Sequence, residues 1–439
     1  MPTVNVSTSQ TLQKRITDKS AKVGVVGLGY VGLPLAVEFA KAGFSVTGID
    51  VLPHKVDAIN RGESYIQDIP TSVLKPLVES GHIQATTDFK AVRDLDTINI
   101  AVPTPLRKTK DPDMTFIDSA CTEISKFFEP GKLIILESTT YPGTTEEVVL
   151  PMLAKDGYKV GEDFFLCFSP ERVDPGNPQY HTFNIPKVVG GITLACTEMG
   201  ALFYSQALER VVPVSSTSVA EMVKLLENTY RMINIGLVNE IAMMCDRMGI
   251  NVWEVIDAAA TKPFGFMPFY PGPGLGGHCI PIDPFYLSWK TKQQGIEARF
   301  IDLAGYINGQ MPHFVIDKIQ NALNDATKPV RGSKVHVAGV AYKRNIDDVR
   351  ESPALDLIHL LKQRGAAVTY SDPFVETVRF DDGNMHAHDL LTEAETADCV
   401  VIVTDHAKFD YEGLVQRARL IVDTRNALKK FKSPNIVRL

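Results

Sequence analysis

The sequence predicts an α/β fold with two Rossmann-like, doubly wound domains that are joined by a long central helix. Apolar strands and helices alternate from residue 22 to about residue 210, and again from about residue 326 to residue 439. Between these blocks, apolar residues follow helical spacing from Ser218 to Met248. Because strand–helix alternation is typical of parallel sheets with helices on both faces, we expect each block to form such a sheet.

Length and composition set the outline of the molecule. A chain of 439 residues is too long for one hydrophobic core, so we expect an N-terminal extension (1–21), a first α/β domain (22–210), a central helical domain (211–325) and a second α/β domain (326–439). The net charge of −7 argues against nucleic acid or an anionic membrane as the partner. The first 21 residues lack the apolar core of a signal peptide, and no apolar run is long enough for a membrane span. The six scattered cysteines show no metal-binding spacing, which favours a reducing cytoplasm and no structural metal.

The secondary-structure elements follow from apolar periodicity. In the first block we expect a strand over residues 22–27, a helix over 33–42 that Gly43 ends, and strands over 44–50, 97–102, 133–136 and 164–168. The central helix is apolar nearly all round, so we expect it to be buried, either between domains or against a second subunit. In the second block we expect strands over 335–340, 366–372, 399–403 and 420–423, and a helix over 352–364.

A glycine-rich turn fits the dinucleotide-binding pattern G-x-G-x-x-G. The turn consists of Gly27, Leu28, Gly29, Tyr30, Val31 and Gly32. Glycines there permit a tight bend, a close approach to a pyrophosphate and close packing of helix on strand, and the helix N-terminus attracts the phosphates. Asp50 ends the next strand, where a carboxylate can accept both ribose hydroxyls and repels a 2′-phosphate, and Lys55 could reach the same edge. The pattern predicts NAD as the cofactor; a turn without a ligand is the alternative.

Cys279 is the candidate nucleophile. It lies in a Gly- and Pro-rich loop, whereas the other five cysteines lie among apolar residues, where a buried and inert thiol is usual. A thiol can form a thiohemiacetal with an aldehyde, and loss of a hydride then gives a thioester. Asp283 follows one helical turn later and could orient the hydrolytic water. The alternatives are a packing cysteine and a helix-capping or loop acid.

Polar residues on the central helix form a second candidate group. Lys224 and Asn228 are four residues apart and share a face with Glu221 and Arg231. A lysine and an asparagine there could together stabilise a substrate oxyanion. The alternatives are a solvated stripe or an ordinary salt bridge between Glu221 and Lys224.

Several longer motifs are more specific than these physical patterns. The chain contains GLGYVGLP (27–34), ESTTYPGT (137–144), SPER (169–172), PGPGLGGHCIPIDP (271–284), and AYKR (341–344) with DVRESP (348–353). In this order, and over nearly the whole chain from residue 22, they resemble the UDP-glucose/UDP-mannosamine dehydrogenase family. The stretch 258–266 before Tyr270 is most similar to the bacterial enzymes that oxidise UDP-N-acetylglucosamine for surface polysaccharides such as capsule or lipopolysaccharide O-antigen.

The resemblance implies a four-electron oxidation of the C6 hydroxymethyl group of a UDP-sugar to a carboxylate, with two NAD reductions and no release of aldehyde. Cys279 matches the catalytic thiol, Lys224 and Asn228 the oxyanion and water pair, and Asp283 the acid after the thiol. Glu171 matches an acid or base that works through water, and Thr139 a hydroxyl near the reacting carbon and the nicotinamide, while UDP-N-acetylgalactosamine, UDP-N-acetylmannosamine and UDP-glucose are the alternative substrates.

The resemblance also assigns binding roles, and the long apolar helix favours a homodimer, with a higher oligomer as the alternative. The implied NAD contacts, beyond the glycine turn, are Thr104, Ser138, Thr139 and Arg350. The implied substrate contacts are Glu171, Arg172, Lys224, Asn228, Lys262, Tyr270, Gly272, Gly274, Gly276, Lys343 and Arg425. For Arg350 the alternative is an ordinary ion pair with Asp347 or Glu351.

The chain departs from the family pattern at two positions, and two other functions remain open. Asp174 stands near the place where many relatives carry a second glutamate, and Lys262 stands where UDP-glucose enzymes place an arginine of the neighbouring subunit. A two-electron hydroxy-acid or sugar-phosphate dehydrogenase would need a lysine but no thiol, and would form one NADH per turnover. A non-catalytic NAD sensor would turn over no UDP-hexose.

Overall fold

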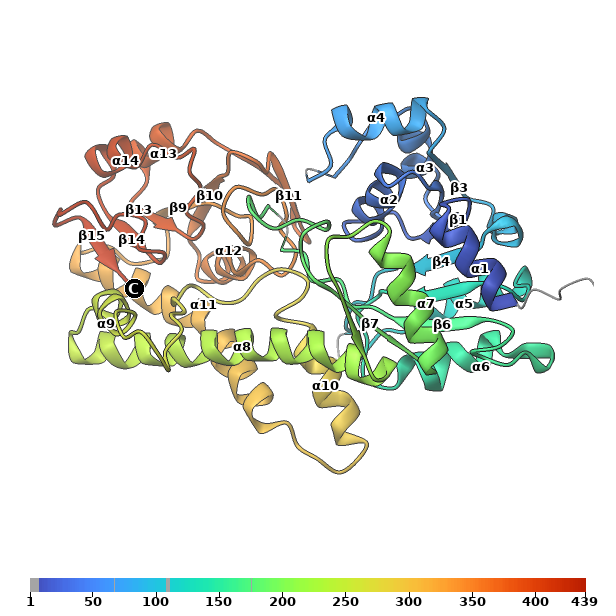
Figure 1. Cartoon of the computed structure of the whole chain (residues 1–439). Coiled ribbons are helices and arrows are strands. Elements are labelled where there is room, and N and C mark those ends of the chain that lie inside the picture. Colours follow the sequence, from blue (N-terminus) through green and yellow to red (C-terminus); the bar gives the residue numbers. More distant parts are fainter. Residues whose placement is uncertain (1–7, 67, 108–110, 175) are drawn as a thin grey trace, which may run out of the picture. The chain divides into compact units, whose positions relative to one another are not determined.

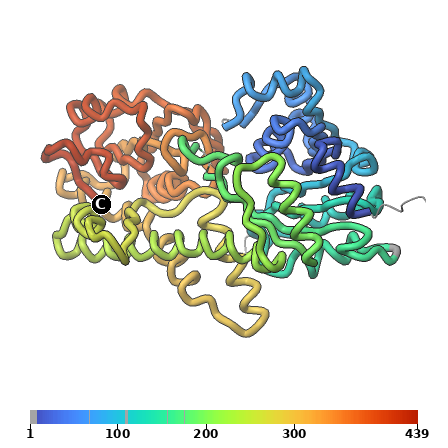
Figure 2. Tube along the Cα trace, viewed as in Figure 1, coloured from blue at the N-terminus to red at the C-terminus, as the bar shows by residue number. Residues whose placement is uncertain are grey.

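The computed structural model describes residues 8–66, 68–107, 111–174 and 176–439. These residues form two compact units. The first unit contains the described residues up to Glu227 together with Trp289–Gln294, and the second contains Asn228–Ser288 and Gly295–Leu439. Two helices, α8 (Thr217–Met248) and α10 (Asp283–Lys292), contribute residues to both units, and Figure 2 follows the chain through them. Of the predicted extension 1–21, residues 1–7 lie outside the described residues.

The first unit is built on an eight-stranded sheet with the order β3-β2-β1-β4-β5-β6-β7-β8. Its strands are drawn in blue to green in Figure 1. The strands are β1 (Lys22–Val26), β2 (Ser45–Ile49), β3 (Ile83–Thr86), β4 (Thr97–Ile100), β5 (Leu133–Leu136), β6 (Phe165–Phe168), β7 (Lys187–Gly191) and β8 (Val211–Val214). Strands β1 to β6 pair in parallel, but β7 is antiparallel to β6, so the prediction of a wholly parallel sheet is wrong there. A parallel return needs a crossover segment, usually a helix. No helix is assigned in 169–174 or 176–186, and the chain returns in the opposite direction.

Helices cover both faces of this sheet because alternate strand residues point to opposite sides. Val25, Ile135 and Cys167 belong to the core on one face, and the neighbouring Val26 and Ile134 belong to the core on the other. The first core includes residues of α1 (Thr8–Thr17), α2 (Gly32–Lys41), α3 (Pro53–Asn60), α4 (Thr71–Glu79) and α7 (Leu194–Ser205). The second includes residues of α5 (Thr115–Lys126) and α6 (Leu150–Leu153). This is the predicted doubly wound architecture.

The second unit contains a five-stranded parallel sheet with the order β10-β9-β13-β14-β15. Its strands are β9 (Lys334–Ala338), β10 (Ala367–Ser371), β13 (Cys399–Ile402), β14 (Ile421–Asp423) and β15 (Ile436–Arg438). One face packs against α11 (Arg299–Asp325) and α12 (Pro353–Gln363), and the other against α13 (Leu390–Thr396) and α14 (Tyr411–Arg417). A hairpin of β11 (Thr377–Phe380) and β12 (Gly383–His386) and the short helix α9 (Val252–Ala259) complete the unit. The second sheet is therefore also doubly wound, as predicted.

Helix α8 matches the predicted central helix, but its burial is uneven. Met232 and Ala242 on one side are buried. Leu226, Leu237 and Met248 are 59%, 53% and 63% exposed in the single chain, so the expected burial of this side against a second subunit stays a prediction. Among the described residues, no helix is long and apolar enough to cross a membrane.

Candidate active site

The glycine turn between β1 and α2 has the geometry that the pattern predicts. Gly27 has a positive φ of 92°, and a Cβ there would lie 2.4 Å from the carbonyl oxygen of Ala101. A Cβ on Gly32 would lie 1.8 Å from the carbonyl oxygen of Gly27, because helix and strand pack closely at this point. A Cβ on Gly29 would meet nothing within 4 Å, which leaves the open approach that a pyrophosphate needs. Val31 precedes α2 without a side-chain cap, so no cap at this residue competes with a phosphate.

Asp50 follows β2 and faces the same turn. Its Oδ2 accepts a hydrogen bond from the Leu28 N–H at 2.9 Å, and its Oδ1 accepts one from Leu52 at 3.0 Å. Lys55 Nζ lies 3.4 Å from Oδ2, so the predicted neighbour does reach this edge. These bonds fix the carboxylate at the carboxyl end of the strand, where it can bind ribose hydroxyls. The turn and its acid therefore fit a dinucleotide without a 2′-phosphate.

Ser138 and Thr104 lie at the ends of the neighbouring strands. The Ser138 hydroxyl, which is buried, donates to the carbonyl oxygens of Val102 at 2.8 Å and Ile100 at 3.3 Å. Ser138 thus ties the end of β5 to the loop after β4, on which Thr104 is half-buried. Both predicted positions are at the carboxyl edge of the sheet that carries the glycine turn.

A buried cluster of charges surrounds Glu171. Lys187 Nζ lies 3.1 Å from Glu171 Oε2 and 2.7 Å from Glu137 Oε2, and the Tyr204 hydroxyl donates to Glu137 at 2.6 Å. Burial raises the pKa of Glu171, but the Lys187 ammonium and the N–H groups of Val173 and Arg172 outweigh it, so the pKa is lowered from its usual value. Burial raises the pKa of Glu137. Of the two carboxyls, Glu171 is the one held ionised.

The side chain of Arg172 is held by hydrogen bonds to other groups of the protein. Its guanidinium binds both oxygens of Glu227, at 2.6 and 3.1 Å, and donates to the Pro186 carbonyl at 2.8 Å. These contacts fix the main chain that donates to Glu171. In this structure Arg172 therefore positions the Glu171 loop.

Lys224 reaches Thr139 from the first turns of α8. Its ammonium donates a hydrogen bond to the Thr139 hydroxyl, and Lys224 is only 8% exposed. Glu221 does not pair with Lys224. Instead it accepts hydrogen bonds from the N–H groups of Gly143 and Thr145, at 2.6 and 2.9 Å, and from the Thr145 hydroxyl at 2.7 Å. Both alternatives for this stripe, a solvated face and a Glu221–Lys224 salt bridge, are therefore wrong, because the turn 143–145 takes the Glu221 carboxylate.

In the second unit, Cys279 and Asp283 occupy the start of α10. The Cys279 carbonyl accepts the Asp283 N–H at 2.8 Å, which confirms that the cysteine loop runs into a helix. Asp283 is 2% exposed, and its Oδ2 accepts a hydrogen bond from Asn228 Nδ2 at 2.7 Å. The Cys279 thiol is half-exposed, and its sulfur lies 2.9 Å from Nδ1 of His278. The structure thus brings three of the predicted residues together, because Asp283 is hydrogen-bonded to both Cys279 and Asn228.

The glycine-rich loop before Cys279 packs closely against the second α/β block. The Gly272 N–H donates to Asn239 Oδ1 at 3.0 Å, and a Cβ on Gly272 would lie 2.5 Å from the Arg425 guanidinium. Gly274 has a positive φ of 140°, and a Cβ on Gly276 would lie 2.6 Å from Tyr342 Cβ. A side chain at Gly272 would displace Arg425, and one at Gly276 would displace Tyr342, which explains the small residues at these two positions.

The aromatic and basic residues before this loop are more exposed. Tyr270 stacks on Trp253 with ring centroids 6.0 Å apart, and its hydroxyl donates to Asp257 at 2.9 Å. Lys262 is exposed, with its ammonium 5.0 Å from the ring centroid of Phe264. Both side chains remain accessible to a ligand in the single chain.

The second α/β block repeats the turn of the first. Gly339 after β9 has a positive φ of 87°, and Asp372 after β10 accepts the N–H groups of Val340 and Ala341 at 2.8 and 3.0 Å. The buried His406 also contacts Asp372, at 3.0 Å. This acid is bound by protein groups on both oxygens, because Phe374 and Val375 donate to its Oδ1. Asp372 ends the strand that the sequence predicts over residues 366–372, as Asp50 ends the corresponding strand of the first block.

Lys343, Arg350 and Arg425 lie around the same block. Lys343 is half-buried on the loop after β9, and Arg425 Nε donates to the Val403 carbonyl at 2.9 Å. Arg350 is exposed and forms a bidentate pair with Asp348, with the shorter contact at 2.6 Å. The alternative of a pair with Asp347 or Glu351 is wrong, because Asp348 is two residues away in a turn and accepts the Arg350 N–H as well.

Comparison with known proteins agrees with this geometry. Residues 21–208, 218–310 and 336–430 match the NAD binding domain, the central domain and the UDP binding domain of the UDP-glucose/GDP-mannose dehydrogenase family. The chain belongs to this family. It is 38% identical to a UDP-N-acetyl-D-mannosamine dehydrogenase of Escherichia coli over 403 residues, 89% of this chain and 94% of that protein. It is 33% identical to an NDP-N-acetyl-D-galactosaminuronic acid dehydrogenase of Ralstonia solanacearum, over 92% and 95% of the two chains.

Solved structures agree with this assignment. A UDP-D-ManNAc dehydrogenase of Pyrococcus horikoshii superposes with a TM-score of 0.86 at 31% identity, over 95% of this chain and 98% of that chain. The UDP-N-acetyl-mannosamine dehydrogenase Cap5O of Staphylococcus aureus superposes with a TM-score of 0.83 at 33% identity, over 95% and 97%. As a member of this dehydrogenase family, the protein is an oxidoreductase that uses NAD and acts on a UDP-sugar.

Proposed function

We propose that the protein oxidises C6 of a UDP-N-acetylhexosamine to the carboxylate, with Cys279 as the covalent nucleophile. The observation that carries this proposal is the cysteine loop. Of the six cysteines, all within the described ranges, Cys279 alone is not buried. The helix that it precedes begins with Asp283, a buried carboxylate that Asn228 holds in place. A thiol with a fixed acid one turn away suits formation and hydrolysis of a thioester.

In the first oxidation, the substrate hydroxyl loses its proton and C6 loses a hydride. When bound, NAD would serve as the hydride acceptor for both oxidations. Glu171, held ionised by Lys187, is the proposed base that takes the hydroxyl proton through water. Lys224, already bonded to Thr139, is the proposed cation that stabilises the negative charge on the C6 oxygen.

In the second oxidation, the Cys279 sulfur bonds to the aldehyde carbon, and the resulting thiohemiacetal loses a hydride to become a thioester. Water then breaks the carbon–sulfur bond, and Asn228 and Asp283 are the proposed groups that orient this water. The balanced reaction consumes one alcohol, one water and two NAD⁺, and yields one carboxylate, two NADH and three protons. The thiol is restored at the end.

The family assignment and the geometry support these binding roles. The glycine turn and Asp50 are the proposed NAD contacts, with Thr104, Ser138 and Arg350. Lys343, Arg425 and the loop 270–276 are the proposed contacts for UDP and the sugar, since they lie in the segments that match the family's central and UDP binding domains. Arg425 lies against Gly272, so the predicted arginine and the predicted loop are neighbours.

The identity of the sugar is the most specific part of the proposal. The sequence motifs resemble enzymes of UDP-N-acetylglucosamine, which is the first candidate substrate, and a uronate made from it serves surface-polysaccharide synthesis. UDP-N-acetylmannosamine is the second candidate, because relatives at 38% identity are named for it. Both candidates carry an acetamido group at C2 and differ in the direction of that group.

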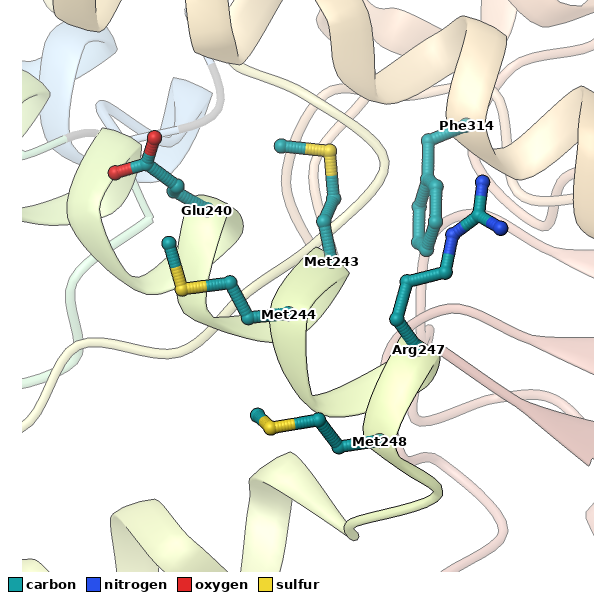
Figure 3. A pocket seen from close by; sticks show the side chains of 6 residues that line it. All are labelled: Glu240, Met243, Met244, Arg247, Met248 and Phe314. Atoms are coloured by element: carbon teal, nitrogen blue, oxygen red, sulfur yellow. The ribbon is translucent and has the colours of Figure 1, made fainter.

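The exposed side of α8 supports a homodimer. Beside it, a hollow of about 530 Å³ is lined by Glu240, Met243, Met244, Arg247, Met248 and Phe314 (Figure 3). Exposed apolar residues continue along α8 at Leu226 and Leu237. A contiguous apolar helix face of this kind is typical of a subunit interface. Sedimentation of the purified protein at several concentrations tests this part.

The reaction is tested with a panel of UDP-hexoses. NADH and acid are measured together for the N-acetylglucosamine, N-acetylmannosamine, N-acetylgalactosamine and glucose nucleotides, and we expect two NADH per sugar consumed. The Cys279→Ser variant should form no acid, whereas Cys245→Ser, at a buried position, should keep the wild-type ratio. One NADH per turnover would favour the two-electron alternative. Acid formation by Cys279→Ser at the wild-type yield would refute the covalent mechanism.

A further inference from the structure

The proposed function leaves one group beside the thiol without a role. Nδ1 of His278 lies 2.9 Å from the sulfur of Cys279, within hydrogen-bonding range for a sulfur partner. Both side chains are half-exposed, and both belong to the loop that precedes α10. An imidazole nitrogen at this distance can accept the thiol proton, and the reverse hydrogen bond, from imidazolium to thiolate, uses the same geometry.

The start of α10 favours the ionised thiol. The Cys279 carbonyl accepts the N–H groups of Ile282 at 3.0 Å and Asp283 at 2.8 Å, so Cys279 is joined to the first turn of this ten-residue helix. The N-terminal end of a helix carries partial positive charge and stabilises an anion nearby. Cysteines at such positions and next to a protonated histidine have lowered thiol pKa values. Asp283 opposes this effect, although its carboxylate is occupied in part by Asn228.

Asp348 provides the negative charge that an imidazolium needs. The loop 348–351 touches the cysteine loop, because the Gly277 N–H donates to the Arg350 carbonyl at 3.0 Å. Burial raises the pKa of Asp348, but the hydrogen bonds and charge of Arg350 and the charge of His278 outweigh it, so the pKa is lowered. Asp348 therefore stays ionised near His278. Charged residues of this unit near the pair include Asp283, Asp348 and Arg350.

We propose that His278 is the catalytic base that converts the Cys279 thiol into the thiolate. The proton passes from Sγ to Nδ1, and the sulfur lone pair then forms the bond to the C6 aldehyde carbon. When water later cleaves the thioester, the sulfur leaves as a thiolate beside the imidazolium, so the pair is ready for another turnover. No further reactant is needed. The inference rests on the proposed role of Cys279 as nucleophile.

The test measures ionisation of the thiol without any substrate. The full-length protein is treated with iodoacetamide between pH 5 and pH 9 (about the range over which thiols titrate), and alkylation of the Cys279 peptide is followed by mass spectrometry. In His278→Gln we expect the midpoint of the pH profile to rise and alkylation at neutral pH to slow about tenfold, because an unassisted thiol is mostly protonated there. The variant His359→Gln, at an exposed histidine of α12, is the matched control and should keep the wild-type profile.

Two further measurements make the result decisive. His278→Asn should show the same upward shift, and thermal unfolding verifies that each variant is folded before alkylation is compared. A wild-type alkylation profile in folded His278→Gln would overturn the proposal. Acid formation by Cys279→Ser would instead refute the covalent mechanism, and the two failures are distinguishable because alkylation needs neither NAD nor a UDP-sugar.

Discussion

Replacement of Lys187 with methionine should destabilise the first unit strongly. The Lys187 ammonium is the shared partner of Glu137 and Glu171, at 2.7 and 3.1 Å, and the three side chains are 5%, 0% and 9% exposed. Methionine fills the same volume but leaves two carboxyls buried without a cation. Removal of one partner of a buried ion pair typically lowers the free energy of unfolding by about 3–5 kcal/mol. For a unit of this size, a loss of about 4 kcal/mol lowers the unfolding midpoint by about 8–16 °C.

The loss in free energy of unfolding caused by Lys187→Met should depend on pH. In the wild-type protein the lowered pKa of Glu171 means that its carboxylate stabilises the fold above the unfolded value of about 4.3, and that this contribution is lost as the pH falls through the folded pKa. Without Lys187, burial dominates and raises the pKa of both carboxyls. A raised pKa means that the penalty grows as the pH rises and vanishes as the pH falls. The difference in the free energy of unfolding between wild type and variant should therefore shrink as the pH falls from about 8 to about 5, because buried carboxyls with raised pKa values titrate in about this range.

Denaturant unfolding at several pH values measures this difference. Lys126→Met is the matched control, since Lys126 pairs with Glu123 on an exposed helix surface and its loss should change the free energy of unfolding by less than about 0.5 kcal/mol. A loss below about 1 kcal/mol for Lys187→Met at neutral pH would show that the buried pair does not hold these carboxyls. The same conclusion would follow if the loss in free energy of unfolding did not change with pH.

Three further predictions concern the cofactor turn and its acid. Gly29→Ala should leave the unfolding midpoint unchanged yet weaken NAD binding by about tenfold or more in calorimetry, because a Cβ there meets no protein atom but blocks the pyrophosphate. Gly32→Ala should lower the free energy of unfolding by about 2 kcal/mol or more, because its Cβ would overlap the Gly27 carbonyl. Equal unfolding midpoints for Gly29→Ala and Gly32→Ala would contradict this distinction. Asp50→Ala should reduce the preference for NAD over NADP by about tenfold in kcat/KM, since the carboxylate that repels a 2′-phosphate is gone, and an unchanged ratio would remove Asp50 from this role.

Local patterns were sufficient for much of the fold. Apolar periodicity placed the long helix within one residue of α8, and the alternation of strands and helices predicted both doubly wound sheets. The glycine turn and Asp50 were also identifiable, because their conformations depend on residues within a short stretch of chain. The antiparallel return of β7 was not, since strand direction depends on the path of a long loop between β6 and β7.

Side-chain partners far apart in the sequence were decided by the tertiary structure. Lys187 joins Glu137 and Glu171 across 50 and 16 residues, and no spacing rule indicated that a lysine of β7 would meet them. The spacing likewise left a salt bridge between Glu221 and Lys224 open as an alternative, whereas folding brings the turn 143–145 to the Glu221 carboxylate.

The sequence by itself determined the types of chemical group present and the local turns that present them: a thiol in a glycine loop, an acid at a strand end, and a lysine and an asparagine on one helix face. Only the tertiary structure decided which charges are paired, which are buried and which polar groups hold each other in place. The physical reason is that local conformation depends on near neighbours in the chain, whereas desolvation and hydrogen bonding depend on neighbours in space.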